Sequence, residues 1–262
     1  MTSADMTSPH LSILMGVFNE SLRIRRSIDS ILAQTFTEWE LIVMDDNSTD
    51  ATFSILQRYA EQDQRNKVFK NAENIGVFAS MNAALVRSVA PLIARMDGDD
   101  EMLPNKLKVQ MDFMSEHPEI GVLGSGAFFV DSSGAALKTV TFPETHAEIA
   151  AVMPYSNPII NPSVVMRRSL LADKFYAEKI RRAGDYELWS RLIKVTQFHN
   201  LPTPLIRYLV NDVKPVSTAM WTLYVRLLIA IRLRSPRGVV YAFLGTAKML
   251  ATKHGAEVKR KA

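Results

Sequence analysis

The 262-residue chain contains no cysteine, which excludes disulfide bonds and metal sites built from thiolates. Its first twelve residues lack the basic region and apolar run of a secretory signal. A transmembrane helix is not expected either, because three prolines interrupt the longest uncharged run, residues 149–166. Together these absences predict a cytoplasmic protein.

The chain also lacks both common glycine-rich phosphate loops, GxGxxG and GxxxxGK[ST]. A Rossmann-type dinucleotide site and a P-loop are therefore not expected. The segment VFNES stands where a sugar nucleotidyltransferase would carry its own glycine-rich loop, which argues against that class as well. The five histidines show no metal-ligand spacing, so we expect each of them to be structural or exposed.

What the chain does contain is a large apolar fraction and an uneven distribution of charge. Hydrophobic residues make up 47% of the chain and charged residues 22%, which is typical of a globular protein with a sizeable core. The net charge of +4 divides into −4 for residues 1–220 and +8 for residues 221–262. A mildly acidic body is thus followed by a basic tail.

We expect residues 216–262 to form a basic, amphipathic helical tail that Ser235-Pro236 divides into two helices. Apolar and aromatic residues interleaved with Arg and Lys are typical of an interfacial element, in peripheral contact with anionic lipid on the inner face of the cell membrane. A helical hairpin packed on the body with its basic residues outward fits the same pattern. Nucleic acid is not an expected partner, because no recognition motif accompanies the basic charge.

Apolar runs alternate with helical patterns along the body, which predicts an α/β fold. Four strands, each followed by an amphipathic helix, are expected at residues 12–18, 39–44, 66–71 and 91–96. Such alternation implies right-handed crossovers and a Rossmann-like, mostly parallel sheet flanked by helices.

The pattern loosens after the fourth strand and its helix. Two more strands, at residues 120–131 and 135–143, suggest a hairpin that turns at residues 131–134. We place the whole sheet domain at residues 11–215, after a disordered N-terminus of residues 1–10.

Three predicted strands end in polar clusters: Asn19-Glu20 after the first, DDNS (45–48) after the second and DGDD (97–100) after the fourth. In open α/β sheets, ligands bind beyond the carboxyl ends of the strands. The three clusters come from different strands but belong to one edge of the sheet. This convergence predicts a binding site at that edge.

The DGDD cluster favours a cation. Carboxylate oxygens suit Mg²⁺ or Mn²⁺, and such a site often takes one or two carboxylates while substrate phosphates complete the shell. Asp97 and Asp99 can bracket one ligand, and Gly98 lets the backbone turn between them. The alternative is a solvated acidic turn before the helix that begins at Pro104.

The DDNSTD cluster (45–50) has a structural alternative of its own. Ser48, Thr49 or Asp50 would serve as the N-cap of the following helix. That role leaves Asp46 unexplained, and a carboxylate at a strand end can accept hydrogen bonds from a base or a ribose.

Six segments in this order resemble the large family 2 of inverting nucleotide-sugar glycosyltransferases, of GT-A fold. The segments are SILMGVFNE, WELIVMDDNSTDAT, ENIGVFASMNAAL, IARMDGDDEMLPNKLKVQ, NPIINPSVVMRRSLL and GDYELWSRL. The resemblance covers about residues 11 to 210. No single segment is decisive, but their order is highly specific.

The resemblance implies a donor site at the strand ends. Phe18, Asn19 and Glu20 stand where the first strand of the family meets the nucleotide base. Asp46 stands where the family binds uracil or ribose.

The same resemblance assigns the D-x-D motif and a base. Asp99 would hold the metal, Mg²⁺ or Mn²⁺, on the donor diphosphate, and Asp97 would lie near the ribose with Gly98 between them. Asp185 in GDYELW matches the general base of the family, since an attacking sugar hydroxyl must lose its proton. As a structural alternative, Asp185 would be the N-cap of the helix that follows.

The chain departs from the family pattern at three places. Gly184 replaces an acid that often precedes the base, and Asn161 replaces a histidine of the NPIxHPSV segment. Residues 208–211 read YLVN, without the arginine and the histidine that are common there. A third protein ligand for the metal is therefore not expected.

The sequence thus predicts a metal-dependent inverting hexosyltransferase that moves a sugar from a nucleotide-diphosphate donor, a UDP-sugar, to a hydroxyl of a glycan or lipid-linked saccharide. Relatives of this kind build surface polysaccharides. Transfer to polyprenyl phosphate is an alternative that the same fold supports. A catalytically degenerate nucleotide-sugar binding module is the alternative outside enzymes.

Overall fold

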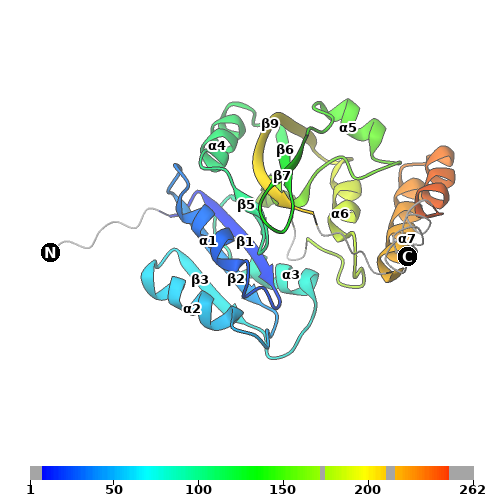
Figure 1. Ribbon diagram of the computed structural model, residues 1–262. Coiled ribbons are helices and arrows are strands. Elements are labelled where there is room, and N and C mark those ends of the chain that lie inside the picture. The colour runs from blue at the N-terminus through cyan, green and yellow to red at the C-terminus, as the bar shows by residue number, and fades with distance from the viewer. Residues whose placement is uncertain (1–7, 172–174, 211–215, 248–262) are drawn as a thin grey trace.

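The computed structural model describes residues 8–171, 175–210 and 216–247, and in these residues one sheet is flanked by helices (Figure 1). The strands are β1 (Leu11–Val17), β2 (Trp39–Asp45), β3 (Asn66–Lys70), β4 (Leu92–Asp97), β5 (Glu101–Met102), β6 (Ile120–Val130), β7 (Ala136–Val140), β8 (Val165–Arg167) and β9 (Gln197–Leu209). The α-helices are α1 (Ile24–Leu32), α2 (Thr52–Gln62), α3 (Val77–Arg87), α4 (Lys106–Glu116), α5 (His146–Val152), α6 (Gly184–Leu192) and α7 (Val216–Arg232), and residues 236–247 form a further helix.

The strand order is β3-β2-β1-β4-β8-β6-β9-β5, with β7 beside β6. Neighbours among β3, β2, β1 and β4 are parallel. Because β8 is antiparallel to both β4 and β6, and β9 is parallel to β6, the strands β6 and β9 run in the same direction as β1. The predicted α/β fold with a mostly parallel sheet is confirmed, and β5, β7 and β8 are its antiparallel additions.

The alternation of side chains in β1 shows why helices cover both faces of the sheet. Leu11, Ile13 and Met15 belong to one buried cluster, whereas Leu14 belongs to another, because successive side chains of a strand point to opposite faces. The first cluster contains buried residues of α1, α2 and α4. The second contains buried residues of α3, α5, α6 and α7.

Several expected boundaries can be compared with the structure. The six predicted strands are all present, and Asp131 Oδ1 accepts the N–H groups of Ser133 and Ala135 in the predicted turn between β6 and β7. Pro104 precedes α4, which begins at Lys106, so it lies in the turn before the helix rather than in its first turn. Of the N-terminal segment that was predicted to be disordered, residues 1–7 lie outside the described residues.

The N-cap prediction for α2 was wrong in position. The N-cap residue is Ala51, which has no side-chain cap. Asp50 nevertheless supplies the missing acceptor from one position earlier, since its Oδ1 accepts the N–H of Thr52 at 2.9 Å. Ser48 does not cap the helix, because its hydroxyl accepts a hydrogen bond from the N–H of Asn19 in the loop after β1.

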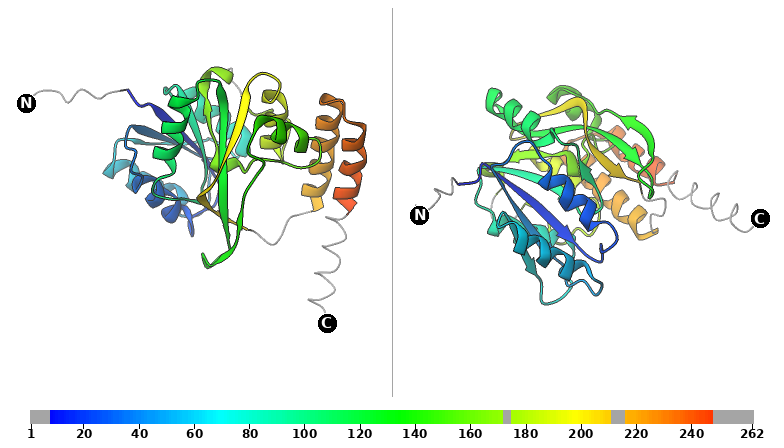
Figure 2. Two further views of the ribbon diagram at one scale, coloured as in Figure 1. Left: turned by 90° about the horizontal axis from the view of Figure 1, so that it is seen from above. Right: turned by 60° about the vertical axis from the view of Figure 1, so that its left-hand side comes forward.

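The described part of the tail, residues 216–247, forms two helices that a turn at residues 233–235 separates, as the Ser235-Pro236 step predicted, and residues 248–262 lie outside the described residues. Figure 2 shows α7 and helix 236–247 side by side at one end of the molecule. Val225 and Ile229 of α7 are fully buried against the body, and Arg232 Nη1 lies 2.9 Å from Glu187 Oε1 of α6. Within the described part of the chain, no helix has the length and apolarity needed to cross a bilayer.

Candidate active site

The polar clusters predicted at the strand ends do meet at one sheet edge. Val17, the last residue of β1, pairs with Asp45 of β2, and Gly16 pairs with Asp97 of β4. Leu209, the last residue of β9, reaches the same edge, where its N–H donates to Asp100 Oδ1 at 2.8 Å. The edge is therefore built by the parallel direction of β1, β2, β4 and β9.

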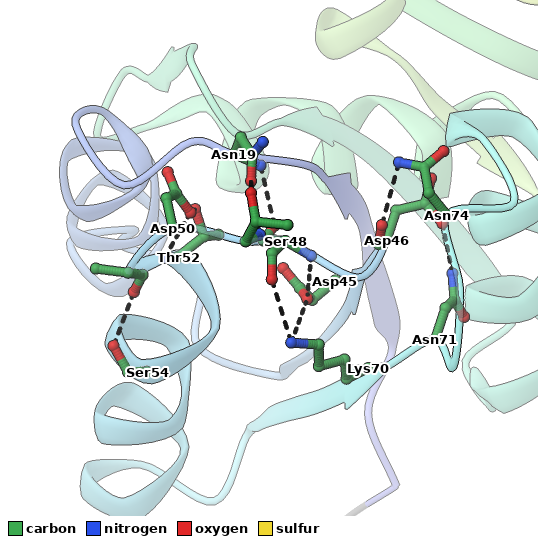
Figure 3. A network of polar contacts seen from close by, with 12 residues as sticks. Asn19, Asp45, Asp46, Ser48, Asp50, Thr52, Ser54, Lys70, Asn71 and Asn74 are labelled. Carbon is green, nitrogen blue, oxygen red and sulfur yellow. Dashed lines mark hydrogen bonds and ion pairs between the residues drawn. The ribbon is translucent and has the colours of Figure 1, made fainter.

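Asn19 joins the loop after β1 to the loop after β2 (Figure 3). Its backbone is left-handed, with φ of 55°, a conformation that Asn tolerates better than most residues. Its N–H donates to Ser48 Oγ at 2.9 Å, and its Oδ1 accepts the N–H of Thr49 at 2.9 Å. Next to it, Phe18 is 45% exposed, and its contact with a nucleotide base stays a prediction.

Asp46 is turned toward the loop before α3 rather than toward solvent. Its Oδ1 accepts from Asn71 Nδ2 and from the N–H of Ile75, each at 2.9 Å, and its Oδ2 accepts the N–H of Gly76 at 2.8 Å. Gly76 is the N-cap of α3 and has φ of 89°, so the carboxylate sits at the positive end of that helix. The structure thus gives Asp46 a clear role in holding this loop, and its contact with a nucleotide stays a prediction.

Asp97 is paired with a buried cation. The Arg95 guanidinium is 3% exposed and donates to Asp97 Oδ1 and to the carbonyl of Met96. The Tyr176 ring is buried beside Arg95, and its hydroxyl donates to Asn161 Oδ1 at 3.1 Å. Asn161, which replaces the family histidine, is therefore linked through Tyr176 and Arg95 to Asp97.

Glycine is required at position 98 because the fold leaves no room there for a Cβ atom. A Cβ at Gly98 would stand 2.8 Å from Val17 Cγ1 and 3.3 Å from Ile24 Cδ1. This close approach lets the loop after β4 lie directly on β1 and α1. The backbone does turn at residues 98–99, as expected.

Asp99 lines a small cavity of about 180 Å³ beside α1 and β9. Arg23, Arg26 and Arg207 share its wall with two further acids, Glu101 and Asp131. Arg26 is paired with Glu101 and Arg23 with Glu20, whose pKa is raised by burial and by the neighbouring Asp99. A small cavity with guanidinium groups on its wall suits a phosphate group, and its carboxylates suit the counter-ion of that phosphate.

Asp185 lies in the first turn of α6, so the interpretation as an N-cap was wrong. The N-cap is Ala183, whose φ of 57° is left-handed, and it makes no side-chain cap. Asp185 Oδ2 accepts from Asn157 Nδ2 at 2.8 Å, and the N–H of Tyr186 also donates to the carboxyl. Burial, helped by the charge of Asp97, raises the pKa of Asp185 despite these two donors.

Tyr208 of β9 lies close enough to the carboxylates of β4 and α6 for their charges to act on it. Burial, together with the charges of Asp100, Asp97, Asp185 and Asp99, raises the pKa of its phenol. Asp100 itself is 1% exposed, and burial followed by the charges of Asp97 and Asp99 raises its pKa well above the ordinary value. We call Asp97, Asp99, Asp100 and Asp185 the site carboxylates below.

Arg95, Tyr176, Asn157 and Tyr208 were missed by sequence reasoning. Arg95 carried a signal, because a charged residue inside an apolar strand, two positions before Asp97, must share a face with it. Asn157 lies 28 residues before Asp185, and no local pattern connects the two. Of the YLVN segment, Tyr208 is described, whereas Asn211 lies outside the described residues.

The histidines behave as expected where they are described. His10 lies 3.1 Å from Glu38, His117 lies 3.2 Å from Glu119, and the His199 ring stacks on Phe113. None of these contacts is part of the sheet edge that carries the site carboxylates. His254 lies outside the described residues.

The carboxylates fit a cation only with help from a ligand. In residues 8–171, 175–210 and 216–247 there is no group of three or more His, Asp or Glu side chains that could hold a metal. Asp97 and Asp99 supply hard oxygen ligands, and one or two carboxylates are enough for Mg²⁺ when phosphate oxygens complete the shell. Since Asp97 Oδ1 is paired with Arg95, the donor set fits a cation shared with a bound diphosphate.

Comparison with known proteins gives one family. The model of glycosyl transferase family 2 matches residues 12–173. The chain is 31% identical over 187 residues to the putative teichuronic acid biosynthesis glycosyltransferase TuaG of Bacillus subtilis (strain 168), across 71% of this chain and 73% of TuaG. It spans about two thirds of the length of the first curated relatives that it matches.

Two solved structures share the fold. S. aureus TarS 1–349 in complex with UDP-GlcNAc gives a TM-score of 0.66 at 22% identity, covering 85% of this chain and 66% of that chain. The mannosyltransferase PcManGT from Pyrobaculum calidifontis, in complex with GDP-Man and Mn²⁺, gives a TM-score of 0.61 at 17% identity, covering 98% and 83%. At these identities the likeness establishes the arrangement of the elements and no more.

Proposed function

The chain belongs to glycosyl transferase family 2 and has a GT-A fold, and from this premise we propose that it is an inverting hexosyltransferase of polysaccharide biosynthesis. It takes a sugar from a nucleotide-diphosphate donor, a UDP-sugar, and transfers it to a hydroxyl of a glycan or lipid-linked saccharide. The names of TuaG and of TarS with UDP-GlcNAc support this substrate class. The reaction takes place at the inner face of the cell membrane.

The observation that carries the proposal is the position of Asp185. Its carboxyl lies near enough to Asp97 and Tyr208 for their charges to interact, burial raises its pKa, and we place the reacting groups in the space beside it. A sugar hydroxyl is a weak nucleophile, so a carboxylate must accept its proton while the oxygen attacks the anomeric carbon. A raised pKa makes Asp185 a stronger proton acceptor, and the hydrogen bond from Asn157 fixes the direction of its carboxyl.

The donor occupies the other side of this space. Phe18, Asn19 and Glu20 line the end of β1 where the base binds, and Asp97, held by Arg95, receives the ribose. Asp99 lies with Arg23, Arg26 and Arg207 in the cavity where the diphosphate binds. Arg207 attracts the diphosphate and offsets part of its charge when it becomes the leaving group, whereas Arg23 and Arg26 also pair with Glu20 and Glu101.

A divalent cation, Mg²⁺ or Mn²⁺, belongs to this proposal as a cofactor that Asp99 holds with the help of Asp97. When bound, it would neutralise charge on the departing nucleoside diphosphate. Mn²⁺ in the PcManGT complex supports this choice of metal. Displacement in one step, with the base on the side opposite the leaving group, inverts the anomeric centre.

The first experiment measures the melting temperature of the chain with a panel of UDP-, GDP- and dTDP-sugars, each with and without Mn²⁺. A ligand that binds only the folded state stabilises it by about 2.7 kcal/mol at a hundred times its Kd. We expect a metal-dependent rise with the UDP-sugars, and its loss in Asp99→Ala. No rise with any donor at millimolar concentration would contradict the donor site.

The second experiment determines the anomeric configuration of the product by NMR. An inverting enzyme converts an α-linked donor into a β-linked product in a single displacement. Retention of the α-configuration would rule out the role of Asp185 as a base that activates the acceptor.

A further inference from the structure

The C-terminal helical hairpin, formed by α7 and helix 236–247, has an outward side that is apolar. On α7 the residues that face solvent follow each other at helical spacing: Met220, Tyr224 and Ile231 are 51 to 72% exposed. The residues on the opposite side, Val225 and Ile229, are fully buried against the body. A surface helix in contact with water alone has the reverse arrangement, with polar residues outward.

Helix 236–247 repeats this pattern. Its small residues face inward, since Ala242 is buried and a Cβ at Gly238 would stand 3.1 Å from Ala230 of α7 and from Pro154. Four large residues that are 55 to 60% exposed lie on the rest of its surface: Val240, Tyr241, Phe243 and Leu244. We call these four, together with Met220, Tyr224 and Ile231, the outer face of the hairpin.

The outer face continues into an apolar groove. The groove has a volume of about 420 Å³ and lies between Met220, Trp221 and Tyr224 of α7 and the segment that contains Lys179 and Ile180. That segment leads into α6, which carries Asp185 in its first turn. The outer face therefore reaches the chain segment that immediately precedes the proposed base.

The charge on the two helices of the hairpin has one sign. Residues 216–247 contain no Asp or Glu, while Arg234 and Arg237 are exposed at the turn between the two helices. Near the groove, three cations, Lys179, Arg181 and Arg182, are exposed beside one exposed acid, Glu178. Apolar and aromatic side chains that are flanked by an excess of cations match the boundary between the acyl chains and the head groups of an anionic bilayer.

We propose that the outer face of the hairpin is a docking surface for an anionic lipid bilayer. Its apolar and aromatic side chains enter the head-group region, and Arg234 and Arg237 contact lipid phosphates. The sequence allowed either a hairpin packed on the body or an interfacial element, and the two faces of the hairpin serve both roles. Docking would present Asp185 to a lipid-linked acceptor, and this part of the proposal rests on the proposed function. Lipid binding itself does not.

A second copy of the chain fits this surface less well. A symmetric contact through the outer faces would place Arg234 and Arg237 of one copy near those of the other. Neither helix has an acid within the described residues that could pair with them, so like charges would meet at the rim. An anionic bilayer instead offers a negative charge to each of these side chains.

The test is co-sedimentation of the 262-residue chain with phosphatidylcholine vesicles that contain either no anionic lipid or about 30% phosphatidylglycerol. We expect binding to the anionic vesicles that weakens at about 1 M NaCl, where the Debye length is about 3 Å. In Ile231→Glu/Leu244→Glu, the partition coefficient is expected to fall at least about 100-fold, because the bilayer loses two apolar side chains that would be buried in it. Arg234→Gln/Arg237→Gln should lower it about fivefold for each arginine, on anionic vesicles only.

A matched control tests whether any exposed apolar residue would behave in this way. Val86 and Val89 are 65% and 64% exposed at the end of α3, and Val86→Glu/Val89→Glu should bind vesicles like the original chain. Each variant is first compared with the original chain by circular dichroism and by its melting-temperature response to the donor. Retained donor binding shows that a loss of lipid binding is not a loss of folding or of the donor site.

Three results would overturn the proposal. The first is that the original chain binds none of the vesicles, and the second is that Ile231→Glu/Leu244→Glu binds them as well as the original. The third is a dimer, seen by analytical ultracentrifugation, that Ile231→Glu/Leu244→Glu converts to a monomer while vesicles bind neither protein, which would assign the face to a second copy. Failure of glycosyl transfer with intact lipid binding would contradict the proposed function alone.

Discussion

Two groups of carboxylates stand at the same sheet edge, and the protein surrounds them in different ways. Asp45, Asp46 and Asp50 at the end of β2 accept hydrogen bonds from main-chain N–H groups, those of Ser48, of Ile75 in the loop before α3 and of Thr52. Although burial acts in the opposite direction, hydrogen bonds from Thr52 and Ser21 lower the pKa of Asp50 to about 2. The fold thus stabilises the charges of Asp46 and Asp50 without any ligand, whereas Asp45 has Lys70 Nζ 4.0 Å from its Oδ2 and no hydrogen-bond partner on its buried Oδ1 in the described structure.

The site carboxylates are less well compensated. Asp100 Oδ2 is buried without a hydrogen-bond partner in the described structure, and burial together with Asp97 and Asp99 raises the pKa of Asp100. The pKa of Asp185 is raised in the same way, by burial and by Asp97. Like charges that lie close together are retained when a ligand compensates for them, so this difference supports the proposal that the site carboxylates take part in the chemistry.

The strongest test of this contrast is Asp185→Asn. An amide cannot accept the proton of the acceptor hydroxyl, so we expect kcat to fall about 10²- to 10⁴-fold. The free energy of unfolding should not decrease, because the substitution removes a buried charge near Asp97. Initial rates of nucleoside diphosphate release and a thermal denaturation curve measure the two effects. Retained donor binding with unchanged turnover would favour another base, and no activity in the original chain would favour the nucleotide-sugar binding module.

Asp46→Asn should have its main effect on the free energy of unfolding rather than on the chemical step. All three donors on the Asp46 carboxylate are N–H groups, so an amide NH₂ would face a donor and leave it unpaired. We expect a loss of about 2–3 kcal/mol in the free energy of unfolding, measured by urea denaturation. Asp112→Asn is the control, because Asp112 is half exposed and pairs only with the exposed Lys108, which predicts a change within about 0.5 kcal/mol.

The sheet edge was predictable because it depends on local patterns. The apolar runs of β1, β2 and β4 alternate with helical patterns, and a parallel sheet that follows from this order places the polar strand ends at one edge. Which of these carboxylates is already compensated was not predictable. The donors to Asp46 come from Ile75 and Gly76, 29 and 30 residues away, and their positions depend on the path of the loop before α3.

The same limit applies to the base and to the tail. Asp185 and Asn157 are brought together by the packing of α6 against the segment before β8, which no spacing in the sequence encodes. For the tail, the helical period predicted an amphipathic pair of helices but not which side faces the body. The direction became clear only from the burial of Val225 and Ile229.

Asn157→Ala sharpens the assignment of the base. The Asn157 amide stabilises the ionised form of Asp185, so its removal should raise the pKa of Asp185 further above its ordinary value. The acid limb of kcat/KM should therefore move to higher pH, and activity on that limb should fall about tenfold for a shift of about one pH unit. Asn161→Ala is the control for the position of the acid limb. Asn161 bonds to Tyr176 rather than to Asp185, so this substitution should leave the acid limb at the same pH even where it lowers activity through the link to Asp97. An equal loss of activity at every pH would indicate a structural role for Asn157.

The smallest expected effect is a gain in stability in Asp100→Asn. The amide oxygen can still accept the N–H of Leu209, which now donates to Asp100 Oδ1 at 2.8 Å. The Asp100 carboxylate is buried close to the charges of Asp97 and Asp99. The substitution replaces it with a neutral amide, which is less costly to bury. We expect the free energy of unfolding to rise by about 1 kcal/mol in buffer with EDTA. The same chemical change, from Asp to Asn, thus has opposite signs at positions 46 and 100, and a loss at Asp100 as large as that at Asp46 would mean that both carboxylates belong to the scaffold.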